Sequence, residues 1–495
     1  MNPLQDSCKA SLVAVTTDEN VSCYPPLDQA PFHPSKSYPE FAGGTISTKP
    51  NRVYDMVRRT LADLGLDREH FGSATWNPFG GLIKPGGRVV VKPNWVNDHN
   101  MGPGGWECLI THPSILRAVL DYILLAGPSD VLLGDSPIQD CDFERLLDLG
   151  VRPVLDYFRQ RKAPLRLADF RRTTLQQDGF SLNVREEIRP LDEYVTVDLG
   201  SDSLLEPISG DARRFRVTKY DPRKMLENHR PGVHRYLIAR DILRADLVVN
   251  LPKLKTHKKA GVTASLKNLV GINGNKDYLP HHRKGSAASG HGDCYEKTSP
   301  LKAMTEHLLD IANMNLHRSW VTRVCHRLAY YFLVLDMKLG GSGEVEGSWY
   351  GNDTIWRTCL DLNRALLYSD DQGILREQPQ RCELSMVDAL IAGEGDGPLK
   401  PDPRPLGTLL ASLNPAACDW IAALMMGFYP QNIPIIARSF GLGKYPIALF
   451  APAQLICRLN GSEVRSQQLV HPQGRIFTPP FGWKSHCESK ERITT

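Results

Sequence analysis

The stretch Asp246-Leu-Val-Val-Asn-Leu-Pro-Lys-Leu-Lys-Thr-His257 decides the fold class of this chain. Its segment Leu247 to Leu251 is short, mostly apolar and contains two β-branched valines, which is typical of a strand buried on both faces. Polar and charged residues follow the run directly. The same order recurs at Arg88-Val-Val-Val-Lys-Pro-Asn94 and at Val131-Leu-Leu-Gly-Asp135.

Helices are expected between these strands. Pro113 opens one helix, 114–125, which Gly127-Pro128 stops, and a second helix covers 143–149. Strands that alternate with helices in this way predict an α/β fold: a mostly parallel sheet flanked by helices, with right-handed crossovers. Further strands are expected at 384–391 and 407–412.

The chain of 495 residues is expected to hold one elaborated α/β domain between two extensions. Residues 1–45 are rich in proline and are expected to be irregular. The α/β domain spans 46–445 and contains a β-rich insertion around 164–220, in which 181–184 is one expected strand. Residues 446–495 form a C-terminal extension with few strand signals.

Composition excludes several functional classes. The formal net charge is +4, from 59 basic and 55 acidic residues, which argues against a dedicated nucleic-acid binder. The 11 cysteines are scattered and none forms a C-x-x-C pair. We therefore expect no iron–sulfur cluster, no zinc ribbon and no disulfide framework, and the thiols indicate a reducing compartment, the cytoplasm.

No membrane span is expected. Met1 to Ala14 contains Asp6 and Lys9 and lacks the apolar core of a secretion signal. The most apolar run, Leu328 to Leu335, is far shorter than the ~18 residues that cross a bilayer. We interpret it as a buried helix. The sequence gives no indication of the oligomeric state.

Basic residues gather after the strand at 247–251. If 253–257 is extended, then Lys253, Lys255 and His257 point to the same face. Eight lysines and arginines lie between Asn250 and Cys294, against only two aspartates, which predicts a surface that attracts anions. A solvated charged loop is the alternative, while a helix cap alone would explain Thr111 and a turn would explain Asp135. The expected anion-binding residues are Lys92, Asn94, His112, Asp135, Lys253, Lys255, Lys267 and Asn268.

Acidic residues follow in the C-terminal half, at Asp353, Asp388 and Glu394. Carboxylates that face lysines across a cleft could bind a divalent cation or act as acid and base, although each could also be a cap or an ion-pair partner. His281, His282 and His291 are metal-ligand residue types on a loop rich in glycine and serine. Their spacing matches no standard zinc template, so a loop that covers the substrate is the alternative.

These motifs together resemble the domain of unknown function 362 family, from about residue 86 to 440. The resemblance rests on Lys92-Pro-Asn-Trp, Thr111-His-Pro, Gly134-Asp-Ser-Pro, 250–257, Leu266-Lys-Asn-Leu-Val-Gly, Gly393-Glu-Gly-Asp-Gly-Pro and Asp419 before Met426-Gly427. The segment Trp349 to Trp356 is similar to bacterial members that we associate with polysaccharide gene neighbourhoods. Some members carry an iron–sulfur ferredoxin module, from which this chain departs. The family implies no established reaction.

We expect an enzyme that acts on an anionic small molecule, phosphorylated or carboxylated, in bacterial polysaccharide metabolism. His257 is the leading acid–base candidate because an unperturbed imidazole titrates near neutral pH. Asp353 and Glu394 would complete proton transfer, and Asp388 would join a divalent cation site. The alternative is a non-catalytic binding or assembly protein that uses the same basic cleft. A closed pocket favours the enzyme, and a flat basic face favours the binder.

Overall fold

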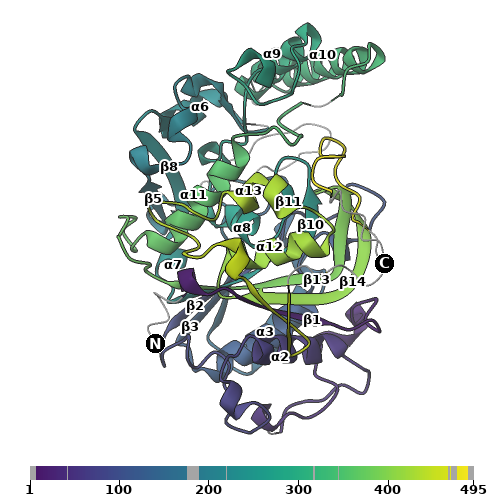
Figure 1. Ribbon diagram of the computed structural model, residues 1–495, viewed down its shortest axis with the longest axis vertical. Helices are drawn as coiled ribbons and strands as arrows, with labels where there is room; N and C mark the ends of the chain where they lie inside the picture. The colour runs from purple at the N-terminus through teal and green to yellow at the C-terminus, as the bar shows by residue number, and fades with distance from the viewer. Residues whose placement is uncertain are drawn as a thin grey trace.

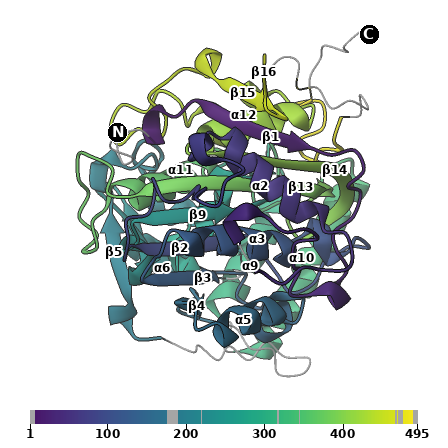
Figure 2. The same cartoon turned by 90° about the horizontal axis from the view of Figure 1, so that it is seen from below.

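A large mixed sheet runs through the molecule, with helices on both faces (Figure 1, Figure 2). The computed structural model describes residues 7–41, 43–174, 189–218, 220–315, 318–343, 345–465, 469 and 476–488. Most strand pairs in the large sheet are parallel, so the predicted α/β class is confirmed.

The parallel part of the sheet has the order β13-β9-β2-β3-β4, and β14 and β1 extend it on the β13 side. β10 also pairs with β13, and β11 pairs with β10. The strands are β1 (Leu12–Thr17), β2 (Arg88–Pro93), β3 (Asp130–Asp135), β4 (Leu165–Asp169), β9 (Leu247–Leu251), β10 (Lys253–His257), β11 (Gly261–Thr263), β13 (Cys382–Asp396), β14 (Lys400–Ser412), β15 (Ile456–Leu459) and β16 (Ser462–Val464).

Alternate residues of each central strand enter two different cores. Val89 and Val91 of β2 pack on one face, and Val90 packs on the other. The first face is covered by α2 (Arg52–Asp63), α3 (Pro113–Leu125), α4 (Phe143–Leu147) and α5 (Val151–Gln160). The second is covered by α8 (Ser265–Asn268), α11 (Ile355–Tyr368), α12 (Pro415–Met425) and α13 (Pro434–Ala437). Burial on both faces explains why these strands are continuous apolar runs.

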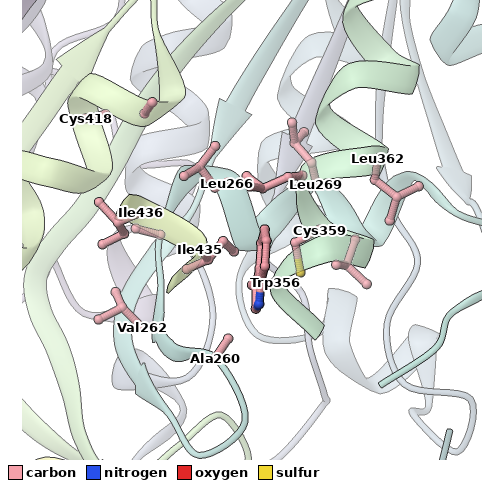
Figure 3. Close-up of a cluster of buried hydrophobic side chains, with 14 of the residues drawn as sticks. Ala260, Val262, Leu266, Leu269, Trp356, Cys359, Leu362, Cys418, Ile435 and Ile436 are labelled. Carbon is pink, nitrogen blue, oxygen red and sulfur yellow. The ribbon is translucent and has the colours of Figure 1, made fainter. Parts of the chain in front are cut away.

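The second core anchors the short helix α8. Leu266 and Leu269 point into a cluster with Trp356 and Cys359 of α11, and Ile435 of α13 closes it (Figure 3). These side chains are almost completely buried, so α8 is held on both sides. Polar residues of α8 are consequently fixed relative to the sheet.

Smaller sheets flank the main one. One consists of β5 (Tyr194–Asp198), β8 (Val233–Ala239) and β7 (His229–Arg230), and the other of β6 (Phe215–Arg216) and β12 (His282–Arg283). α6 (Pro222–Asn228) and α7 (Arg240–Leu243) adjoin them. β5 and β6 fall within the expected β-rich insertion, whereas β4 belongs to the main sheet. The strand expected at 181–184 lies outside the described residues.

Both ends of the chain contribute to the main sheet. β1 lies in the segment expected to be irregular, and that expectation is wrong at Leu12–Thr17. Val13, Ala14 and Val15 are fully buried because β1 pairs with both β14 and β15. The prolines that suggested irregular chain begin only at Pro25, after the strand. β15 and β16 likewise extend the sheet, and the domain boundaries stay predictions.

A helical hairpin lies far from the sheet, at the top of Figure 1. It consists of α9 (Pro300–Met314) and α10 (Ser319–Lys338). The run Leu328–Leu335 is helical, but it is not buried as expected: Leu328 is 45% exposed and Tyr331 is 61% exposed. α10 packs on α9 by one side only. Among the described residues, no helix is long and apolar enough to cross a membrane.

Candidate functional site

A cavity of about 300 Å³ lies at the carboxyl ends of β2, β3 and β10. These strands end at the same edge because β3, β2 and β9 are parallel neighbours, with Lys92 opposite Asn250. This is where open parallel sheets place ligands. Eight of the sequence-predicted site or metal candidates line the cavity: Lys92, Asn94, Asp135, Lys255, His257, Lys267, Asn268 and His281.

A buried ion pair forms part of the cavity wall. Lys92 Nζ lies 2.7 Å from Asp135 Oδ1. The same carboxylate accepts hydrogen bonds from the backbone N–H of Trp95 (2.7 Å) and of Ser136 (2.8 Å). Gly271 packs directly against the pair, because a Cβ there would lie 2.0 Å from Asp135 Oδ1. Burial lowers the pKa of Lys92, and Asp135 opposes that shift.

An asparagine chain leads from the cavity into the sheet. Lys255 Nζ donates to Asn94 Oδ1 (2.8 Å), and Asn94 Nδ2 donates to Asn268 Oδ1 (2.8 Å). Asn268 Nδ2 donates to Asn250 Oδ1 (2.8 Å), whose Nδ2 donates to Glu383 Oε1 (2.8 Å). A protonated lysine can only donate, so the charged form of Lys255 fixes the orientation of every amide along the chain. Burial raises the pKa of Glu383 to about 7.

Lys255 has no carboxylate partner among the described residues, unlike Lys92 and Lys253, which pair with Asp135 and Asp388. Its amine is fully buried and donates to Asn94 Oδ1 and to the carbonyl of Leu109. Burial lowers the pKa of Lys255 well below its usual range, and the charge of Lys253 lowers it further. Lys267 Nζ has no hydrogen-bond or ion-pair partner in the described part of the chain either, and burial lowers its pKa. Neither of these two amines therefore has an ion-pair partner among the described residues.

His257 is held in one tautomer. Its Nδ1 accepts hydrogen bonds from the backbone N–H groups of Lys259 (3.0 Å) and Ala260 (3.2 Å). The neutral ring must therefore carry its proton on Nε2. Burial lowers the pKa of His257 well below 6.5, and the charge of Lys267 is the next largest cause. At Nε2 the neutral ring can donate a hydrogen bond but cannot accept one.

The sequence reasoning did not assign several cavity residues to the site. Lys276 donates to the carbonyl of Ser136 (3.3 Å), and burial lowers its pKa to about 8. Lys259 Nζ donates to Thr218 Oγ1 (3.2 Å), and Glu346 also lines the cavity. Lys259 and Lys276 were both part of the local charge excess, which was the available signal. In all, six lysines and three carboxylates line the cavity: Lys92, Lys255, Lys258, Lys259, Lys267, Lys276, Asp135, Asp140 and Glu346.

Lys253 and His112 do not line this cavity. Lys253 Nζ lies 2.6 Å from Asp388 Oδ2 and donates to Tyr24 Oη (2.6 Å). Asp388 also accepts from the backbone N–H of His112 (3.0 Å), and the His112 ring is stacked between Tyr24 and Trp106. The pairing of β10 with β13 shifts register between Lys253 and Lys255, so simple alternation does not hold there. Lys255 and His257 do share the cavity, as alternation predicts.

The other acidic and histidine candidates do not converge on the cavity. Asp353 forms an ion pair with Arg357 at 3.1 Å, and Glu394 accepts from the backbone N–H of Thr478 (2.9 Å). His282 is buried outside the cavity lining and His291 is exposed. In the described ranges, no group of three or more His, Cys, Asp or Glu side chains could hold a metal ion. Asp353 and Glu394 therefore do not face the cavity lysines as expected, because they already serve local partners.

The comparisons with known proteins agree with the motif resemblance. Residues 191–424 match the family described as Domain of unknown function (DUF362). A thylakoid-associated protein of Synechocystis sp. is 22% identical over 375 residues, which are 75% of this chain and 74% of that protein. No solved structure matches the chain.

Proposed function

We propose that this chain, whose residues 191–424 match the DUF362 family, is an enzyme. It would act on an anionic small molecule bound in this cavity. The molecule would carry a phosphate or a carboxylate. The observation that carries the proposal is the pair of amines, on Lys255 and Lys267, that face the cavity without an ion-pair partner among the described residues.

Charge balance supports an anionic ligand. Lys92 has Asp135 and Lys253 has Asp388, so these two cations are neutralised within the protein. Lys255 has only neutral acceptors, and its neighbours Lys253 and Lys267 repel a proton from it. An anion in the cavity would reverse that repulsion and favour the protonated amine. Binding should therefore be accompanied by proton uptake.

The remaining groups suit catalysis rather than storage. His257 would donate a hydrogen bond from Nε2 to an oxygen that gains negative charge, while its fixed tautomer prevents it from taking up a proton there. Lys276, with a pKa of about 8, could exchange a proton near neutral pH. A walled cavity of about 300 Å³ also favours the enzyme over a protein that binds through a flat basic face.

We further propose that the chain works in the cytoplasm, in bacterial polysaccharide metabolism. No disulfide joins any of the 11 cysteines and ten of them are buried, which suits a reducing compartment. The link to polysaccharide metabolism rests on the likeness of the Trp349–Trp356 segment to certain bacterial members of the family.

Native mass spectrometry of the full chain, purified without denaturation, tests the proposal. We expect a retained phosphorylated or carboxylated metabolite in the wild type and its loss in Lys267→Met. Lys297→Met is the matched control, because Lys297 is exposed and lies outside the cavity lining. Incubation of the released metabolite with fresh protein should yield a product of different mass. A retained anion that is never converted would instead establish the binding protein, and no retained or bound anion would contradict both functions.

A further inference from the structure

The outer side of α10 carries a stripe of exposed apolar side chains. Trp320, Val324, Leu328 and Tyr331 follow the spacing i, i+4, i+8 and i+11, which places them on one helix face. Their exposed fractions run from 45% for Leu328 to 65% for Trp320. The opposite face of α10, with Cys325 and other buried residues, packs on α9. A contiguous stripe of exposed apolar side chains usually marks an interaction surface.

Positive charge borders the stripe without exposed negative charge on the same helix. Arg327 and Lys338 are exposed on this side of α10. The one carboxylate of α10, Asp336, is buried and accepts from Ser299 Oγ (2.6 Å). The carboxylates of α9 are also engaged: Glu306 is buried, and Asp310 forms ion pairs with Arg216 and Lys284 at 2.8 and 2.6 Å. The exposed face is thus apolar, aromatic and cationic.

We propose that the α9–α10 hairpin docks this face on an anionic lipid surface. An interfacial helix buries Trp, Tyr and Leu at the level of the headgroups while Lys and Arg reach lipid phosphates. The hairpin is suited to this because it lies away from the main sheet (Figure 1) and the stripe is on the side of α10 opposite α9. The helix lies along the surface and does not cross it.

Charge complementarity favours lipid over a second copy of the chain. Two copies that met through α10 would bring Arg327 and Lys338 of each copy close to the same cations of the other, and no exposed carboxylate of α10 would neutralise them. A symmetric contact of this kind repels itself. Lipid phosphates supply the missing negative charge.

Vesicle co-sedimentation of the full chain tests the proposal. We expect binding to vesicles that contain phosphatidylglycerol and much weaker binding to pure phosphatidylcholine, with the difference reduced by salt. The double variant Arg327→Gln/Lys338→Gln should bind the anionic vesicles about thirtyfold more weakly, since each basic residue near such a surface contributes about 1 kcal/mol. Trp320→Glu/Leu328→Glu should abolish binding to both kinds of vesicle.

The control is Ile374→Glu, which alters an exposed apolar residue outside the hairpin, 54% exposed, and should bind like the wild type. Circular dichroism verifies that each variant folds. We expect all of them to fold because the four altered positions on α10 are exposed. Wild-type protein that stays in the supernatant with anionic vesicles overturns the proposal. Sedimentation velocity supplies a second test. A concentration-dependent dimer that Trp320→Glu/Leu328→Glu dissociates, without vesicle binding by the wild type, would assign the face to self-association instead.

Discussion

Replacing Gly271 by alanine should disrupt the ion pair in the cavity wall. The added Cβ would lie 2.0 Å from Asp135 Oδ1 and 2.6 Å from Lys92 Nζ, so at least one of these groups must move. Asp135 cannot move freely, because the backbone N–H groups of Trp95 and Ser136 hold its carboxylate. The substitution therefore separates two buried charges or strains the backbone around them.

The magnitude follows from these two responses. Overpacking a buried site costs about 1–3 kcal/mol, and breaking a buried ion pair costs about 3–5 kcal/mol. We expect Gly271→Ala to lower the free energy of unfolding by about 3 kcal/mol, measured by urea denaturation with the slope unchanged. Binding of inorganic phosphate in the cavity should weaken as well, because Lys92 and Asn94 lie in the same wall.

Gly210→Ala is the matched control. Gly210 is exposed, its φ is not in the left-handed region, and a Cβ there would meet no atom within 4 Å. We expect its stability to be unchanged or raised by up to about 1 kcal/mol. If Gly271→Ala behaves like Gly210→Ala in both denaturation and phosphate binding, the packing of Gly271 against the ion pair is refuted.

Two further predictions concern titratable groups. The ring of His257 should stay neutral with its proton on Nε2 from about pH 5.5 to 8 in ¹⁵N NMR spectra, and titration with a midpoint near the ordinary 6.5 would contradict this. Glu383 should make stability fall as pH rises from its ordinary pKa of 4.5 to about 7, because the folded carboxyl holds a proton that the unfolded one releases. Glu383→Gln should remove that part of the pH dependence of stability, which is worth a few kcal/mol. The measurement is urea denaturation of both proteins below pH 4.5 and above pH 7. An unchanged pH dependence in the variant would contradict the raised pKa of Glu383.

The parallel centre of the sheet could be predicted because its strands are buried on both faces. Such strands must be continuous apolar runs, and Val89–Val91 and Leu247–Val249 stand out in the sequence for that reason. The polar residues after the runs then converge at one edge, as Lys92 and Asn250 do. β1 was not predicted because it is a single short strand, and the segment that follows it is rich in proline and shows no strand or helix periodicity.

Among the candidates of β10, the site was predictable where strand alternation decides it. Lys255 and His257 share the cavity through simple alternation, whereas a register shift and the partner Asp388 remove Lys253 from it. Asp353 is not a cavity residue because Arg357, four residues further along the chain, pairs with it, and this i,i+4 spacing was a signal that the sequence offered.

The exposure of the apolar side chains of α10 could not be predicted from the sequence either. The run at Leu328 is apolar enough for a core helix, and nothing in its composition shows that α9 covers only one side. Whether a helix face is covered depends on which elements the fold brings to it, and this hairpin packs away from the main sheet.

The most direct test of the anion site is calorimetric titration of the wild type with inorganic phosphate, and in parallel with citrate, near pH 8 in buffers of different ionisation enthalpy. We predict that at least one of the two anions binds and that the heat depends on the buffer, because the Lys255 amine takes up a proton when the anion arrives. Lys255→Met should bind more weakly and with less proton uptake. Absence of binding by both anions, or binding that is identical in wild type and Lys255→Met, would contradict the account.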